Sequence, residues 1–424
     1  MTSQSVRRLL RPPLSEPVDV LLADVAIRVQ LSRTDYRKAE ERYETLGNWI
    51  DRRGSPLEGL VQLVYAQGSM AIGATIASRL TTDEHDVDFI AQLGLPYGTP
   101  PHVVLDLLYK SIRGEPGSLY YDMAERRNRC VTVHYADKMH ADITPMIRLL
   151  GRPERESHLF HNKPENPAEP DQTLVANAYG FAEWFKENTP IDHEFAAIFE
   201  GRAREYEQLV LSAKADSEEM PDQEPVYRKS RGVIVLQLMK RWRNVRFDRR
   251  KTRRPPSVMM TKLIADAANS TETLSEELLH QARSMRDELN RWHQAGVLIH
   301  VVNPVCAEDV LTDRWPGSLT EQGVFIDDLD DLVAKVERLI AGCSLPEMQA
   351  IMVGLFGEAP TGEAFKAFNE RTGAAIRQGR SRHIPDLGRL NLPASGIVTG
   401  VAAPLVSRPT PKSTFFGMER RKKR

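Results

Sequence analysis

Three aspartates with the spacing of β-strand residues are the side chains of this chain best suited to chemistry. Asp86 and Asp88 stand two positions apart, and Asp142 lies between the apolar residues Ala141 and Ile143. Side chains two apart on a strand leave the same face, so the carboxylates point away from the core that their apolar neighbours enter. Adjacent carboxylates bind divalent cations that assist phosphoryl transfer. We therefore predict a two-metal site formed by Asp86, Asp88 and Asp142, in which Asp142 also helps to ready an attacking hydroxyl.

A glycine-serine turn precedes these aspartates and predicts a phosphate contact. Gln67, Gly68 and Ser69 follow a strand-like run and lead into a short helical one. Glycine lets backbone N–H groups approach a phosphate, and a helix that begins there adds favourable partial charge. The next residues, 70–72, are Met-Ala-Ile and carry no group that reaches a phosphate. Further contacts to a triphosphate must therefore come from another part of the chain or be absent.

Mixed sheet and helical patterns place these residues in an α+β protein. An apolar stripe predicts one long amphipathic helix within 17–53, ending at Gly54. Strand-like runs and one intervening helix follow at 60–65, 87–93, 102–113 (the helix), 130–135 and 139–147. Later helices are predicted at 173–188, 193–213, 229–247, 259–267 and 271–295. The chain is expected to pair a mixed sheet with a mainly helical second lobe and to bind nucleotides in the cleft between them.

Length and composition limit the number of domains, the kinds of partner and the cellular compartment. The 424 residues are enough for two packed domains, which we expect at 1–165 and 166–345, with C-terminal helices and a flexible basic tail at 346–424. Lys and Arg total 57 against 58 Asp and Glu, which disfavours a polyanion as a stable partner. Three separate cysteines favour the reducing cytoplasm over a disulfide framework. No long apolar run predicts a membrane span.

The ordered motifs resemble those of the polymerase-beta superfamily of nucleotidyltransferases. Within it, residues 67–69 with Asp86, Asp88 and Asp142 are similar to the branch of oligoadenylate synthetase, cyclic GMP-AMP synthase and bacterial relatives in anti-phage defence. The resemblance spans roughly 40–320 and also includes the motifs around Lys240, Ser257, Asn303-Pro304 and Trp315. It implies that Lys240 and Ser257 bind the donor triphosphate together with Gln67, Gly68 and Ser69.

The resemblance also implies a reaction and its ligands. ATP or GTP would be joined into a cyclic oligonucleotide second messenger, a purine-containing cyclic dinucleotide, with release of pyrophosphate. The cofactor would be Mg²⁺ in two copies, with Mn²⁺ as the alternative ion. Accessory defence proteins acting on the tail would be the partners, because Phe415-Phe416-Gly417 is similar to an ending of bacterial relatives. Two other functions stay open: template-independent addition of nucleotides to RNA ends, and an inactive nucleotide-binding regulator.

Other conspicuous residues have simpler interpretations. Lys240 stands in a run of basic residues, and such runs are typical of solvated helix faces. Trp242 has the helical spacing of a core residue. The histidines at 134, 140, 158 and 161 show no spacing typical of metal ligands, and the polar segment 214–225 predicts an exposed loop.

Overall fold

The computed structural model describes residues 13–14, 16–77, 85–166, 168–214, 228–268 and 273–378, with the strand residues 382–384, 389–393 and 405–409. The side chains of His85 and Asp86 and those beyond 378 lie outside this description, as do the segment 215–227 and the tail 410–424. The loop expected at 214–225, Phe415-Phe416-Gly417 and the basic C-terminal run therefore fall almost entirely outside the described residues.

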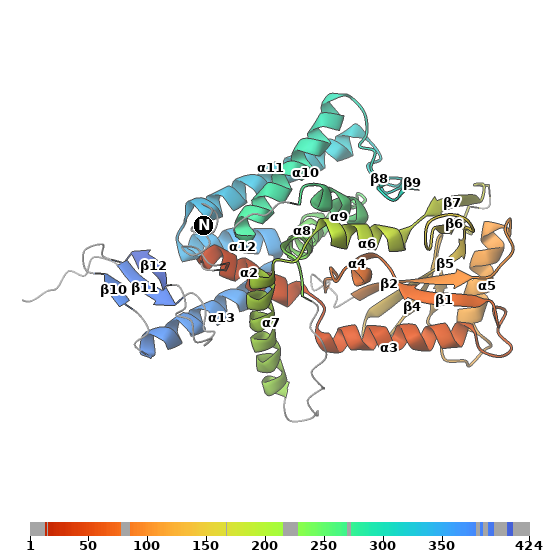
Figure 1. The fold of residues 1–424 in the computed structure, drawn as a ribbon, viewed down its shortest axis with the longest axis horizontal. Helices are drawn as coiled ribbons and strands as arrows, with labels where there is room; N and C mark the ends of the chain where they lie inside the picture. Colours follow the sequence, from red (N-terminus) through yellow and green to blue (C-terminus); the bar gives the residue numbers. More distant parts are fainter. Residues whose placement is uncertain are drawn as a thin grey trace, which may run out of the picture.

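A seven-stranded mixed sheet carries the predicted aspartates (Figure 1). Its strands are β1 Val61–Ala66, β2 His85–Leu93, β3 Ala124–Arg126, β4 Val131–His134, β5 Met139–Arg148, β6 Ser157–His161 and β7 Gln172–Ala176. The order is β1-β2-β5-β4-β3, and β6 pairs with the far end of β5 and with β7. Only β2 and β5 run parallel, at the centre of the sheet.

Helices α3 (Arg33–Ile50) and α5 (Pro101–Arg113) bury one face of this sheet. Leu46 of α3 and Leu108 of α5 form one apolar cluster with Val87 and Phe89 of β2. The alternation of β2 and β5 sends these apolar residues to the helices and the intervening aspartates to the opposite face. The strands predicted in this half are confirmed to within about two residues at most ends, and the helix predicted at 102–113 is α5.

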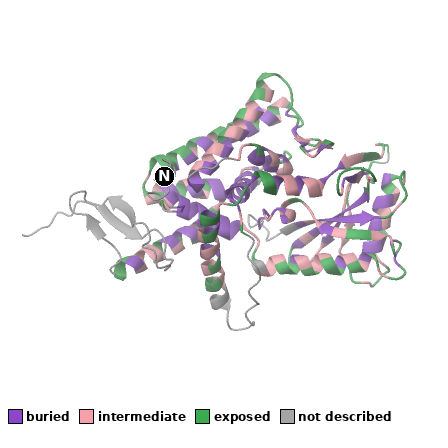
Figure 2. Cartoon of the chain, viewed as in Figure 1, coloured by how far each residue is buried: buried purple, intermediate pink, exposed green. Residues whose placement is uncertain are grey.

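The rest of the chain is mainly helical, as predicted, and folds around one large apolar cluster. Its elements are α6 Ala178–Asn188, α7 His193–Lys214, α8 Arg231–Phe247, α9 Ser257–Asp266, α10 Leu274–Gln294, α11 Leu319–Ala341, α12 Leu345–Phe356 and α13 Glu358–Arg377, with the short strands β8 Val302–Asn303 and β9 Cys306–Val310. Helix α8 lies at the centre, buried along nearly its whole length (Figure 2). Trp242 is fully buried there, which confirms its prediction as a core residue.

Two predicted helices differ from the structure. The N-terminal helix is two helices, α2 (Pro17–Val29) and α3, because Gln30 bridges to Ile76 and Ser32 caps the second helix by accepting from the N–H of Asp35. Helix α2 packs in the helical cluster and α3 on the sheet, so this segment joins both cores. The helix predicted from 173 begins only at Ala178, because residues 172–176 pair with β6 as β7.

Strands also occur where a helical second half was expected. The hairpin β8–β9 contains Asn303, and the antiparallel strands β10 (Arg382–Ile384), β11 (Arg389–Pro393) and β12 (Leu405–Pro409) follow α13. Helices α12 and α13 join the same cluster as α8, and the boundaries expected at 165 and 345 stay a prediction. Within the described ranges, none of the helices combines the length and apolar character that a membrane crossing requires.

Candidate active site

A cleft of about 690 Å³ separates the open face of the sheet from α6, α8 and the start of α9. Seven of the predicted site residues line it: Gln67, Gly68, Ser69, Asp88, Asp142, Lys240 and Ser257. Asp88 and Asp142 stand on strands of the sheet, residues 67–69 form the turn that follows β1, and Lys240 and Ser257 belong to the helical part. Residues up to 190 positions apart in the sequence therefore face one space.

The two described carboxylates come from the central parallel strands. Asp88 of β2 is the register partner of Asp142 of β5, so their Cα atoms are direct neighbours across the sheet. Thr132 of β4 donates to Asp142 Oδ1 at 2.5 Å, which fixes that carboxylate on the cleft face. Asp86 is the register partner of His140 on the same strand pair, and its side chain is not described.

The donor chemistry at this edge fits a divalent cation. Two carboxylates on neighbouring strands present the oxygen ligands that Mg²⁺ prefers. Gly68 stands close to one of them, Asp88: its φ is +56°, and a Cβ there would lie 3.0 Å from Asp88 Oδ2. Among the side chains described, which exclude that of Asp86, no cluster of three or more His, Cys, Asp or Glu is arranged for a metal.

The glycine-serine turn is short and tightly held. Gln67 N donates to the carbonyl of Asp88 at 2.9 Å, and Thr75 Oγ1 contacts Ser69 Oγ at 3.2 Å. The helix that begins at this turn, α4, spans only Gly68–Ala71. Because so few peptide dipoles are aligned, the partial charge predicted for this helix end is small. The apolar residues after the turn pack into the two cores, so a triphosphate needs cations from elsewhere.

Helix α8 places two buried basic residues on the cleft, Lys240 and Arg243. Lys240 Nζ donates to the carbonyl of Ala74 at 2.9 Å, which holds the ammonium beside the glycine-serine turn. The basic run around Lys240 suggested a solvated helix face. That interpretation is wrong, because Lys240 is only 6% exposed. A buried cation retains a strong field because little water screens it.

Arg243, one turn further along α8, is a residue that sequence reasoning missed. Its Nη1 donates to Ser257 Oγ at 2.8 Å and to the carbonyl of Pro255 at 2.8 Å, and its Nη2 donates to Asn244 Oδ1 at 2.9 Å. Burial, and secondarily the nearby Arg254, lowers the pKa of Arg243 to about 9. The signal was present in the sequence: the apolar residues of 231–247 fall on every side of the helix, so its basic residues could not all be solvated.

These elements define a class of protein. A mixed sheet that carries paired aspartates beside a glycine-serine turn, facing buried cations across a cleft, is a nucleotidyltransferase of the polymerase-beta type. The solved structure of CdnC from E. coli MS115-1 with ATP shares this fold, with a TM-score of 0.52 over 80% of this chain and 97% of that chain at 14% identity.

Comparison with known proteins narrows the class to a family. Residues 18–166 match the model of the Second Messenger Oligonucleotide or Dinucleotide Synthetase domain. The cyclic dinucleotide synthase CdnG of Bradyrhizobium diazoefficiens is 36% identical over 411 residues, 95% of this chain and 97% of that protein. Its solved structure in complex with GTP superposes with a TM-score of 0.73 over 84% of this chain and 99% of that chain. A c-di-GMP synthase of Roseivirga ehrenbergii is 22% identical over 93% of this chain and 96% of that protein. The chain belongs to the bacterial family of these second-messenger synthetases, as the sequence motifs predicted.

Proposed function

We propose that this protein joins two purine nucleoside triphosphates, GTP being at least one of them, and closes them into a cyclic dinucleotide with release of pyrophosphate. One observation carries the proposal: Asp88 and Asp142 face Lys240, Arg243 and Ser257 across a single cleft. Metal-binding carboxylates on one wall and phosphate-binding cations on the other are what in-line displacement at an α-phosphate requires.

The metal proposed for the carboxylate wall is Mg²⁺, with Mn²⁺ as the alternative. Asp86, Asp88 and Asp142 would hold two ions. When bound, such ions neutralise charge on the transferred phosphoryl group and favour ionisation of the attacking hydroxyl. Thr132 keeps Asp142 oriented toward the cleft through the 2.5 Å hydrogen bond. Gly68 leaves room for the nearest oxygen of Asp88.

The donor triphosphate would lie between the glycine-serine turn and the wall formed by α8 and α9. Ser69 offers a hydroxyl at the turn, and Lys240 and Arg243 offer charge from α8. Ser257 accepts from Arg243, so its own hydroxyl hydrogen remains available for donation to a phosphate oxygen. Gln67 Nε2 lies 3.2 Å from Thr144 Oγ1, which directs this amide along the floor of the cleft. Together these residues would bind and orient the triphosphate and exclude water from it.

The choice of product rests on the relatives. CdnG of Bradyrhizobium diazoefficiens is named a cyclic dinucleotide synthase and was solved with GTP, and the Roseivirga relative is named a c-di-GMP synthase. Guanine in the product is the simplest inference from both. A role in anti-phage signalling, accessory proteins that act on the tail, and a reducing cytoplasmic location complete the proposal.

The test is a product assay with matched variants. Purified protein is incubated with labelled GTP, ATP and Mg²⁺, treated with phosphatase and examined by mass spectrometry. A phosphatase-resistant cyclic dinucleotide is expected, and Asp88→Asn or Asp142→Asn should each abolish it. Asp330→Asn, an exposed residue of α11 paired with Arg286, is the control and should leave product formation unchanged. Full activity in either cleft variant, or label found only on added RNA ends, would overturn the proposal.

A further inference from the structure

The segment that follows the glycine-serine turn connects the sheet to the helical core. Met70 packs in the apolar cluster of the sheet, whereas Ile72 and Ala74 pack in the cluster that surrounds α8. Helix α4 accordingly lies between the sheet and the helical part (Figure 1). Ser69, at the start of this segment, lines the cleft. Contacts made by the helical core can therefore determine how the Ser69 hydroxyl is oriented.

Two side chains of α8 hold this segment by its backbone. Gln237 Nε2 donates to the carbonyl of Thr75 at 3.0 Å, and Lys240 Nζ donates to the carbonyl of Ala74 at 2.9 Å. Residues three apart on a helix face the same side, so Gln237 and Lys240 bind two successive peptide groups. Gln237 is fully buried and Lys240 nearly so, and little water competes for either carbonyl. Helix α8 thereby fixes the backbone at Thr75.

Thr75 connects this fixed backbone to the Ser69 hydroxyl. Thr75 Oγ1 donates to Ser69 Oγ at 3.2 Å, and the N–H of Ala74 donates to the carbonyl of Ser69 at 2.8 Å. These two bonds close residues 69–75 into a loop. A serine hydroxyl has one hydrogen to donate and two lone pairs that accept. Because Thr75 occupies a lone pair, the hydrogen of Ser69 stays available for a phosphate oxygen.

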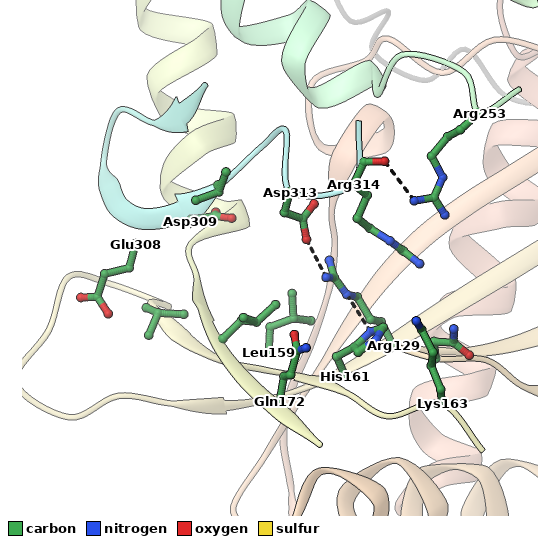
Figure 3. Close-up of a pocket in the computed structure, with 14 residues that line it drawn as sticks. Arg129, Leu159, His161, Lys163, Gln172, Arg253, Glu308, Asp309, Asp313 and Arg314 are labelled. Atoms are coloured by element: carbon green, nitrogen blue, oxygen red, sulfur yellow. Dashed lines mark hydrogen bonds and ion pairs between the residues drawn. The ribbon is translucent and has the colours of Figure 1, made fainter. Parts of the chain in front are cut away.

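The sheet and the helical part also meet beside a second cavity, of about 470 Å³ (Figure 3). There Arg129 Nη2 lies 2.6 Å from Asp313 Oδ2, an ion pair between the residues just before β4 and those just after β9. This ion pair can hold the two parts of the molecule together. The bond from Gln237 to Thr75 differs from it, because it acts on the segment that contains Ser69.

We propose that Gln237 and Thr75 are positioning residues of the active site: Gln237 holds Thr75, and Thr75 orients the Ser69 hydroxyl toward the donor triphosphate. The inference rests on the proposed function, in which Ser69 binds that triphosphate. Gln237 is fully buried and acts through Thr75. Thr75 lines the cleft but acts through its bond to Ser69 and not by contact with the nucleotide.

A double-mutant cycle on the full chain distinguishes this role from a structural one. Calorimetry measures the affinity for a GTP analogue that has a non-hydrolysable α,β-phosphate link, in the presence of Mg²⁺. Ser69→Ala should weaken binding at least about tenfold, because a hydrogen bond to a charged phosphate is lost. Thr75→Val should cause most of this loss, whereas Thr75→Ser keeps the hydroxyl and should restore binding. In the Ser69→Ala background, Thr75→Val should have no further effect, because residues that act through one another are not additive.

Gln237→Met tests the other link. Met keeps the length and bulk of the side chain but cannot donate to the carbonyl of Thr75. Binding of the analogue should weaken about three- to tenfold in the otherwise unchanged chain, and should not weaken further in the Ser69→Ala background. Gln237→Leu is a second apolar variant with the same expected result.

Gln281→Met in α10 is the matched control. Gln281 is 1% exposed, and its Nε2 donates to Glu277 Oε1 at 2.8 Å. Gln281 and Gln237 each have a buried Oε1 without a hydrogen-bond partner among the described residues. The two Met variants should therefore shift the urea unfolding midpoint by similar amounts, while Gln281→Met leaves binding of the analogue unchanged.

Additive losses in the Ser69→Ala background would overturn the proposal, because Thr75 would then contact the nucleotide itself or serve the fold. Wild-type affinity in Gln237→Met would overturn it as well. The product assay tests the proposed function separately. If the cycle shows the expected coupling but the wild type makes no cyclic dinucleotide, the proposed function fails and the positioning role stands. If the dinucleotide is made and the losses are additive, the positioning role alone is wrong.

Discussion

Two buried arginines in this molecule differ in their partners: one is paired with a carboxylate, and the other contacts uncharged groups. Arg202 of α7, 2% exposed, lies in the helical core with its Nη2 2.8 Å from Asp24 Oδ1 of α2, and Arg371 of α13 binds the other oxygen of the same carboxylate. Arg243 of α8, 7% exposed, contacts only uncharged groups among those described: a carbonyl, a hydroxyl, an amide oxygen and a thioether sulfur. Both guanidinium groups are hydrogen-bonded, but only Arg202 is neutralised.

This difference distinguishes an arginine that stabilises the fold from one that is suited to bind a ligand. Burying a charge without a counter-charge costs free energy. Such unpaired groups are typical of functional sites, where a bound ligand can supply the opposite charge. The charge of Arg202 is neutralised by Asp24 of the same chain. Arg243 has no such partner among the described groups, and in the proposed function an anion in the cleft takes that place. Burial, with repulsion from Arg254, lowers the pKa of Arg243 to about 9. Replacing each arginine by Met, which keeps the aliphatic bulk, should therefore produce opposite phenotypes.

Arg202→Met should have the largest effect, and on stability. Asp24 would remain buried with half of its charge compensation, and the loss of one partner from a buried ion pair costs about 3–5 kcal/mol. Urea unfolding followed by circular dichroism should show this loss. The rate of product formation per folded molecule should not change. An unchanged unfolding midpoint would mean that the pair contributes no net stabilisation.

Arg243→Met should do the reverse. Loss of charge-assisted contacts to a triphosphate is worth about 2–3 kcal/mol, so kcat/KM should fall about 30- to 150-fold. The free energy of unfolding should be unchanged or slightly higher, because an uncompensated buried charge is removed. Steady-state kinetics and urea unfolding on the same preparation measure both. A variant that is unstable yet retains wild-type kcat/KM would assign Arg243 to the core.

Site residues could be predicted from the sequence where their strand or helix has a clear hydrophobic period. The period-two alternation around Asp88 and Asp142 fixed both their strands and the face they share, and the structure has them in direct register. Arg243 could not be placed in that way. Its helix is buried on all sides, so no polar stripe separates a functional basic residue from a solvated one. Its role depends on the loop before α9, which brings Ser257 to it from outside the helix.

The fold was predictable where patterns were local. Helices α8 and α10 and strands β2 and β5 carry their own signals. Strand β7 was hidden because residues 172–176 are followed at once by a helical pattern, and only pairing with β6 makes them a strand. The break between α2 and α3 likewise depends on the bridge from Gln30 to Ile76, a contact between distant segments. Elements that depend on contacts between distant segments are difficult to predict from a single sequence.

A buried carboxylate extends the comparison to the opposite charge and predicts a pH dependence. Asp19 of α2 accepts from the N–H of Ser275 at 2.8 Å, and burial, with minor repulsion from Glu16 and Glu276, raises its pKa to about 6. The folded chain then holds a proton that the unfolded chain has lost above about pH 4. Stability from this group is present below the unfolded pKa and is lost as pH rises through about 6.

Asp19→Asn removes that titration. Relative to the wild type, the free energy of unfolding of the variant should therefore rise by roughly 2 kcal/mol between pH 4 and pH 7. Urea titrations of both proteins across this range measure the difference directly. A difference that is flat with pH would mean that Asp19 titrates normally and that its hydrogen bonds offset its burial.

Two glycines with positive φ give the finest test of the distinction between cleft and scaffold. Gly68 (φ +56°) and Gly54 (φ +81°) both adopt the left-handed backbone that favours glycine. A Cβ at Gly54 would meet nothing within 4 Å, whereas one at Gly68 would meet Asp88 Oδ2 at 3.0 Å. Alanine at either position should cost about 1 kcal/mol of stability through backbone strain. Only Gly68→Ala should also lower kcat, because the new methyl group displaces a carboxylate that the reaction needs. Equal activity of the two variants would show that Asp88 tolerates displacement, and that the glycine at position 68 serves the backbone turn alone.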